Sequence, residues 1–228
     1  MKYYISTPDL DAQISEIRRK IKLSMNGIVS EQMSEKGILY KQNYGVTVPR
    51  IKEIAAEFSP NHDLAQRLWN LQIRETMIMA TLLEPTDKFT IKLANEWAEQ
   101  FDQIEIVEQS CMNLYARLPF STELCTEWVS SKNHWIHIAG FILAARVYKE
   151  FNQNKLNLII QKAIEVSTTD DFHLYKAIAL CLSRFCRKNK ETANRILFEI
   201  NEFQNVGSAG QQFILSEVKQ EMLFLEIL

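Results

Sequence analysis

Two histidines, His134 and His137, stand three residues apart, a spacing that places both rings near one face of a helix, as a pair of metal ligands requires. A pair without a third ligand nearby is weak evidence for a metal ion. His62 and His173 stand alone and suggest no site. We therefore expect surface or capping roles for these side chains and no metal.

The sequence lacks the local signatures of several common enzyme classes. It contains no Gly-x-Ser-x-Gly nucleophile elbow, no Gly-x-Gly-x-x-Gly fingerprint and no Walker A loop. These absences remove the commonest nucleotide-site signatures, and we expect no cofactor. A Ser-His-Asp or Cys-His set assembled from distant parts of the chain stays open.

Charge is distributed unevenly along the chain, although the net charge is only −2 and the pI is near 6.1. Residues 96–127 hold seven acids and one base, and residues 172–195 hold six bases and one acid. Residues 18–22 are also basic. Separated fields of this kind can steer a polyanion to one end of a molecule. We predict an anion-binding patch near residues 176–190, with solvated helix faces as the alternative.

The composition predicts that helices position these residues. Apolar residues make up 46% of the 228 residues, which is typical of a folded protein. The chain has only 6 glycines and 5 prolines, against an average usage of roughly 12% for the two together. Barrels, sandwiches and Rossmann-type folds need more turn residues than this.

Helical periodicity runs almost from end to end, and the predicted helices recur in pairs. Trp97 and Trp128 are 31 residues apart, as are Ile104 and Trp135, the expected starts of two successive second helices; Phe172 follows 37 residues later. This drifting period predicts an all-α fold, an α-α superhelix (solenoid) of HEAT- or ARM-like helical hairpins. No linker interrupts it, so we expect a single domain over residues 1–228.

The sequence predicts a cytoplasmic protein. Its first residues lack the apolar region of a signal peptide, and no stretch approaches 18 uncharged apolar residues. The four cysteines form no Cys-x-x-Cys pair and sit in apolar helical patterns, which favours buried thiols: Cys111, Cys125, Cys181 and Cys186.

Several stretches resemble the AlkD-type DNA alkylation repair family. The strongest are a Gly-Val-x-x-Pro-Arg helix start and a Leu-Trp-x-x-x-x-Arg-Glu junction, and the resemblance covers roughly residues 10–200 in order. The stretches are residues 43–50 (NYGVTVPR), 64–75 (LAQRLWNLQIRE), 128–148 (WVSSKNHWIHIAGFILAARVY) and 172–187 (FHLYKAIALCLSRFCR). The resemblance implies HEAT-like helix pairs whose concave face holds duplex DNA. Active members are glycosylases that remove cationic alkylated purines.

The resemblance also locates the family's functional groups. In active members, a carboxylate in a Trp-x-x-x-Asp motif stabilises the developing oxocarbenium ion. Here Ile104 stands in the place of that tryptophan and Glu108 in the place of the aspartate. Ile138 stands in the place of the arginine that the family has three residues after Trp135. Leu180 stands in the place of the family's second aromatic residue. Of the four functional groups, only the carboxylate is kept, and Glu108 carries it on a side chain one methylene longer than aspartate.

These positions give our predicted site residues. Glu108 is the candidate catalytic residue, with an ordinary helix carboxylate as the alternative. The predicted DNA-binding residues are Trp135, Lys176, Arg184, Arg187 and Lys188.

Three functions remain open. The first, which we favour, is a DNA alkylation repair family protein that binds duplex or damaged DNA with its glycosylase activity degraded. The second is an active N-glycosylase that uses Glu108. The third is a protein-interaction scaffold without DNA binding. We expect a monomer that does not bind membranes, with DNA as its partner and a protein partner as the alternative.

Overall fold

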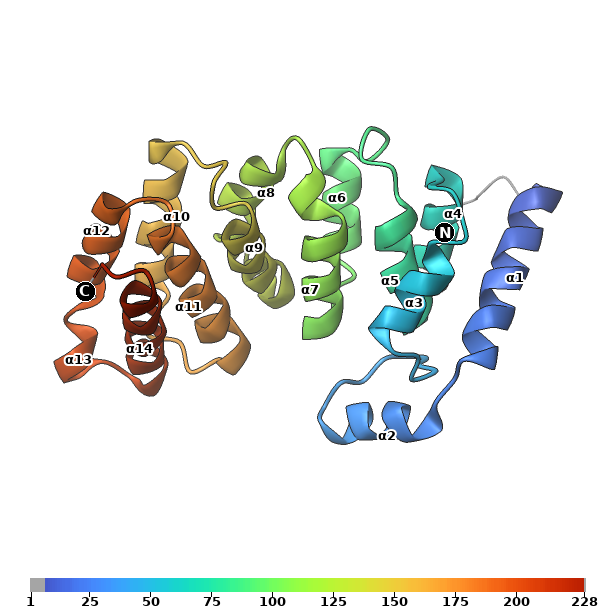
Figure 1. Cartoon of the computed structure of the whole chain (residues 1–228), viewed down its shortest axis with the longest axis horizontal. Helices are drawn as coiled ribbons and strands as arrows, with labels where there is room; N and C mark the ends of the chain where they lie inside the picture. Colours follow the sequence, from blue (N-terminus) through green and yellow to red (C-terminus); the bar gives the residue numbers. More distant parts are fainter. Residues whose placement is uncertain (1–6, 228) are drawn as a thin grey trace. The chain divides into compact units, whose positions relative to one another are not determined.

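A computed structural model describes residues 7–227 of the chain, and within these residues it contains helices and no strand (Figure 1). The all-α prediction is therefore confirmed for the described part. The first six residues, on which part of the signal-peptide prediction rests, lie outside it. No described helix is long and apolar enough to cross a membrane.

The chain forms two compact units. The first holds the residues up to Trp97 together with Phe101–Leu118, and the second holds Ala98–Gln100 and the residues from Pro119 onward. The helices up to residue 118 are α1 (Pro8–Leu23), α2 (Gly27–Glu35), α3 (Val48–Ala55), α4 (His62–Asn70), α5 (Arg74–Leu83), α6 (Ile91–Ala98), α7 (Ile104–Asn113) and the 3-10 turn η1 (Tyr115–Arg117). Those after it are α8 (Ser121–Trp128), α9 (His134–Arg146), α10 (Gln153–Glu165), α11 (Phe172–Cys186), α12 (Lys190–Ile200), α13 (Phe203–Val206) and α14 (Ala209–Phe224).

Side-chain caps define many helix starts. The Thr7 hydroxyl at the start of α1 accepts a hydrogen bond from the Leu10 N–H, and the Asn61 side chain does the same for Leu64 in α4. Thr47 stands at the start of α3, but its side chain makes no cap bond. The caps fix where the helices begin and therefore which face each helix buries.

Aromatic packing forms the centre of the first unit. Trp69 and Trp97 stack with ring centroids 4.1 Å apart and planes 4° from parallel. Phe89 meets the Trp97 ring edge-on at 4.9 Å. The buried ring of Phe89 lies in the connection before α6, and the Thr90 hydroxyl caps that helix by accepting a hydrogen bond from the Leu93 N–H.

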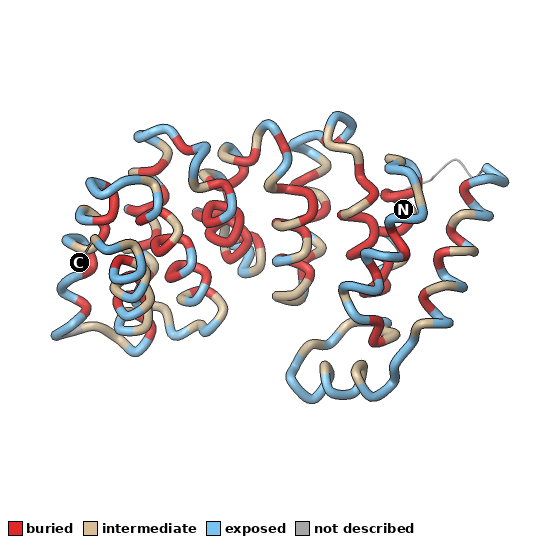
Figure 2. The backbone as a smooth tube through the Cα atoms, in the orientation of Figure 1, coloured by how far each residue is buried: buried red, intermediate tan, exposed pale blue. Residues whose placement is uncertain are grey.

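In the second unit, α8 and α9 form a tight hairpin, and α11 packs between α9 and α14. Their facing sides are buried, as the red segments of Figure 2 show. Trp128 is 1% exposed. All four cysteines of the chain are buried free thiols, which confirms that prediction.

The sequence did not predict α2. This helix buries none of its residues, and Ile28 is 69% exposed. It contacts the rest of the unit through polar bonds, such as that from the Ser30 hydroxyl to the Asn43 carbonyl, and such contacts leave no apolar periodicity in the sequence. Asn26 nevertheless caps it through a hydrogen bond from Val29 N–H.

Candidate nucleic-acid interface

The basic segment predicted near residues 176–190 lies on α11 and the turn that follows it. Asp171 caps this helix by accepting a hydrogen bond from the Leu174 N–H. Lys176, Arg184 and Arg187 follow one face at helical spacing, and the opposite face is buried in the core. The sequence thus places the three cations on the side of α11 that borders α14.

These cations have different surroundings. Lys176 Nζ lies 4.2 Å from the centre of the Phe172 ring and 5.8 Å from that of Phe213 on α14, within range of cation–π attraction. Arg184 forms no ion pair with any described residue. Lys176 and Arg184 therefore have positive charge available for a ligand.

The other two predicted DNA-binding cations are engaged within the unit. Arg187 forms an ion pair with Glu221 of α14, and that hydrogen bond raises the pKa of the guanidinium above its ordinary value. Lys188 Nζ donates to the backbone carbonyl of Phe151. Both side chains thus connect elements of the second unit.

Trp135 lies at the start of α9, where it contacts aromatic rings of α9 and α11. It is half-buried, it meets His134 edge-on at 4.7 Å, and its ring centroid is 5.7 Å from that of His173 on α11. His134 Nδ1 is 3.3 Å from Asp171 Oδ2. Phe172 lies 5.5 Å from His173, so ring contacts connect Trp135 to the residue beneath Lys176.

The two histidines three residues apart have separate environments. His134 pairs with Asp171, whereas the Nε2 atom of His137 is buried without a hydrogen-bond partner. Burial lowers the pKa of His137 below its ordinary value. Within residues 7–227, no group of three or more His, Cys, Asp or Glu side chains is placed to hold a metal ion.

Glu108 lies on α7 in the first unit, where its side chain is exposed. Ile104, in the place of the family's tryptophan, is partly exposed. Ile138 is 0% exposed inside α9, and Leu180 is 38% exposed on α11. The side chain that we expect in the place of the family's arginine, Ile138, is thus buried in the core.

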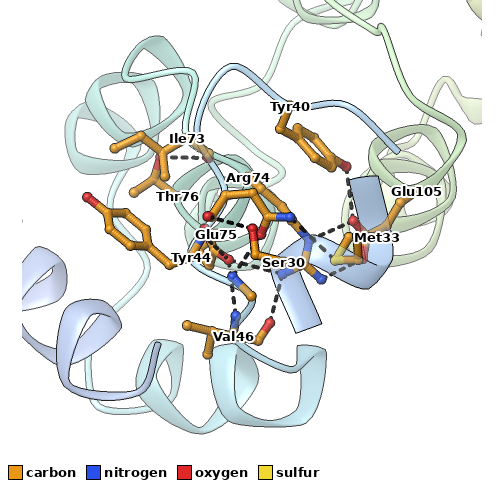
Figure 3. A network of polar contacts seen from close by, with 12 residues as sticks. Ser30, Met33, Tyr40, Tyr44, Val46, Ile73, Arg74, Glu75, Thr76 and Glu105 are labelled. Carbon is orange, nitrogen blue, oxygen red and sulfur yellow. Dashed lines mark hydrogen bonds and ion pairs between the residues drawn. The ribbon is translucent and has the colours of Figure 1, made fainter. Parts of the chain in front are cut away.

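The sequence did not predict a buried polar network around Arg74 (Figure 3). Arg74, at the start of α5, donates to both carboxylate oxygens of Glu105 at 2.7 and 2.6 Å and to the carbonyl of Val46 at 2.7 Å. Glu75, which is 0% exposed, accepts hydrogen bonds from the N–H groups of Tyr44 and Val46.

This network fixes the segment before α3. The Tyr40 hydroxyl donates to Glu105 at 3.0 Å, and burial together with that carboxylate raises the pKa of Tyr40 far above its ordinary value. Burial alone would lower the pKa of Arg74, but its bonds to Glu105 raise it overall. Arg74 and Glu75 were visible in the sequence as part of the Leu-Trp-x-x-x-x-Arg-Glu junction. The partner of Arg74, Glu105, lies 31 residues after it and carried no sequence signal.

Comparison with known proteins agrees with this architecture. A solved structure described as "A new family of proteins related to the HEAT-like repeat DNA glycosylases with affinity for branched DNA structures" aligns with 90% of this chain and 94% of its own, with a TM-score of 0.76 and 12% identity. No curated protein is significantly similar in sequence. The chain is thus an all-α protein of HEAT-like helical repeats, as the period predicted.

Residues 8–199 match the family described as "DNA alkylation repair enzyme". The chain belongs to this DNA alkylation repair family.

Proposed function

We propose that this chain binds DNA through the outer face of α9 and α11 and does not excise alkylated bases. Membership of the DNA alkylation repair family supports a DNA partner. The similar solved protein is described as having affinity for branched DNA, and we extend that property to this chain. Branched or damaged duplexes are therefore the ligands to test first.

The positive charges of Lys176 and Arg184 on α11 are the observation that best supports DNA binding. Neither Arg184 nor Lys176 has an ion-pair partner among the described residues, and Lys176 Nζ lies over the Phe172 and Phe213 rings. Phosphate contacts by such cations release counterions and dominate the affinity of proteins for DNA. Trp135 supplies an aromatic surface beside the same helix. Arg187 and Lys188 are predicted to contribute less, because each already has a partner.

The surroundings of Glu108 and Ile138 support the absence of base excision. Stabilising an oxocarbenium ion requires a carboxylate fixed in a water-poor site, where charges interact strongly. Glu108 is exposed to solvent, where that interaction is screened. Ile138 is buried and has no group that could hold a phosphate.

Fluorescence anisotropy tests DNA binding. Labelled probes are a short duplex, the same duplex with an abasic-site analogue and a four-way junction, each at two salt concentrations. We expect affinity to fall with salt, and Arg184→Gln to reduce the slope of log K against log salt by about 1. Arg117→Gln, which removes an exposed arginine of η1 in the first unit, is the matched control. Absence of binding at low salt would refute the proposal and favour the protein-interaction scaffold.

A base-release assay tests the proposal that the chain does not excise alkylated bases. A duplex that contains N7-methylguanine is incubated with the wild type and with Glu108→Gln, and strands are then cleaved at abasic sites. We expect no release with either protein. Release by the wild type that Glu108→Gln abolishes would establish the active glycosylase instead.

The expected cytoplasmic location and monomeric state stay predictions. A DNA-binding protein must share a compartment with its DNA. Sedimentation of the free protein would test the oligomeric state.

A further inference from the structure

A pocket lies between α11 and α14 in the second unit. Its volume is about 400 Å³, within the range of small-molecule sites. Both helices contribute charged, polar and apolar side chains to it, namely Lys176, Ala179, Leu180, Ser183, Arg184, Phe213, Glu217, Gln220 and Glu221. The wall from α14 lies beyond residue 199, where the family match ends.

The α11 wall has the groups that bind an anion. Lys176 and Arg184 carry positive charge without an acidic partner among the described residues. Ser183 lies between them in sequence, is 8% exposed, and has a hydroxyl without a hydrogen-bond partner. A phosphate group would offer acceptors to these donors.

The α14 wall has a different chemistry. Glu217 forms no ion pair with a described residue, and Gln220 lies one turn further along the helix. Glu221 is engaged by Arg187. A free phosphate ion would be repelled by these carboxylates, whereas an amino group would be attracted to Glu217. The pocket therefore fits a ligand that is anionic at one end and donates hydrogen bonds at the other.

An aromatic ring lies between these two chemistries. Phe213 is half-buried, packs 5.4 Å from Tyr175, and lines the pocket together with Leu180. Aromatic side chains are the surfaces on which unpaired bases stack. Phosphate, flat ring and amino group occur together in a nucleotide.

We propose that this pocket binds one unpaired nucleotide of a DNA strand, with its phosphate at Lys176 and Arg184, its base on Phe213 and a base amino group donating to Glu217. The proposal rests on the DNA-binding function above and specifies what part of the DNA the second unit binds. A paired base cannot enter, because its amino group is bonded to the opposite strand and both its faces are stacked. Flaps and branch points expose such nucleotides.

The Glu217 carboxylate predicts a preference among bases. Cytosine has an exocyclic amine that donates to a carboxylate. Thymine has carbonyl oxygens on both sides of its single ring N–H, and these oxygens repel the carboxylate. Cytosine is therefore favoured over thymine.

Anisotropy with labelled ten-nucleotide strands of deoxycytidine or of thymidine tests this preference near neutral pH. We expect the wild type to bind the cytidine strand about tenfold more tightly. Glu217→Gln, which keeps the shape of the side chain, should bring the two affinities within about twofold, since an amide loses the charge. Arg184→Gln should weaken binding of both strands, whereas Arg117→Gln in η1 should change neither by more than about twofold.

The stacking surface is tested by a second pair of variants. Phe213→Ala should weaken binding of both strands about tenfold, because stacking of a base is lost. Phe198→Ala removes a ring that is 83% exposed on α12 and is the matched control. Circular dichroism of each variant checks that the helices are kept.

The outcomes distinguish the two proposals. Equal affinity of the wild type for the two strands, or a cytidine preference that survives Glu217→Gln, would overturn the nucleotide pocket. If the four-way junction still binds in that case, DNA binding through α9 and α11 stands. If no probe binds, both proposals fail. A cytidine preference that Glu217→Gln removes and the control variants leave intact would establish the pocket.

Discussion

Arg74 binds the carboxylate of Glu105 through two hydrogen bonds, from Nε to Oε2 at 2.7 Å and from Nη2 to Oε1 at 2.6 Å. The arginine side chain is 4% exposed and that of Glu105 is 17% exposed. The pair joins the start of α5 to the start of α7. Glu75, next in sequence to Arg74, is completely buried and also contacts the guanidinium, at 3.1 Å.

Removing Arg74 should therefore destabilise the protein strongly. We expect Arg74→Met to lower the free energy of unfolding by about 3–5 kcal/mol, because buried carboxylates lose their counter-charge. Urea unfolding followed by circular dichroism measures this. The control Arg50→Met breaks an exposed pair with Glu53 and should cost less than about 1 kcal/mol. Equal losses in the two variants would contradict a stabilising role for the network.

Glu84 should make stability depend on pH. It is 1% exposed, and burial raises its pKa above the ordinary value of 4.5, although hydrogen bonds from His62 and Gln66 act in the opposite direction. The folded state holds this proton more tightly than the unfolded state. Its contribution to stability is thus present below the unfolded pKa and is lost as the pH rises through the folded pKa.

The variant Glu84→Gln isolates this effect. We expect the unfolding free energy of the wild type, minus that of the variant, to fall as the pH rises from about 4 to about 7. Urea unfolding at several pH values measures the difference. A difference that stays constant or increases with pH would be inconsistent with a raised pKa.

Gly140 allows α8 and α9 to approach closely. A Cβ atom at this position would lie 2.6 Å from the backbone nitrogen of Val129 and 2.8 Å from the carbonyl carbon of Trp128. Backbone atoms cannot move aside easily, so Gly140→Ala should destabilise the protein by about 1–3 kcal/mol. In Gly27→Ala the new methyl group meets nothing within 4 Å, and no loss is expected. Thermal unfolding of both variants makes the comparison.

The four cysteines should be unreactive in the folded protein. All are buried, and burial raises the pKa of Cys186 to about 12 and that of Cys181 above its ordinary value. The thiolate is the reactive form, so little of it exists at neutral pH. We expect a thiol-specific chromogenic disulfide to react only after urea is added. Rapid release of one equivalent before unfolding would identify an accessible cysteine and disprove the prediction.

The parts of the fold that sequence could predict are those with local signals. Apolar periodicity and repeat spacing placed the starts of α7, α9 and α11 at Ile104, Trp135 and Phe172, within one residue of where they lie. The helix α2 was missed because it buries no side chain. The turn at Leu114, where α7 gives way to η1, also carried no local signal.

The site was less predictable because its contacts connect distant residues. Sequence located the cations of α11, but it could not tell that Arg187 pairs with Glu221 while Arg184 has no partner among the described residues. That difference depends on how α14 packs against α11. The roles proposed for Glu108 and for the five predicted DNA-binding residues stay predictions until binding and base release are measured.

The stacked indoles of Trp69 and Trp97 give the first unit an optical signature. Two parallel chromophores 4.1 Å apart couple their electronic transitions, and this coupling disappears when the rings separate. The other two tryptophans of the chain, Trp128 and Trp135, belong to the second unit. The circular dichroism of the wild type minus that of a Trp69→Phe, Trp97→Phe double variant can therefore follow the melting of the first unit, while the tryptophan emission of the double variant reports on the second. Whether the two halves melt in one step or two is thus measurable without an added label.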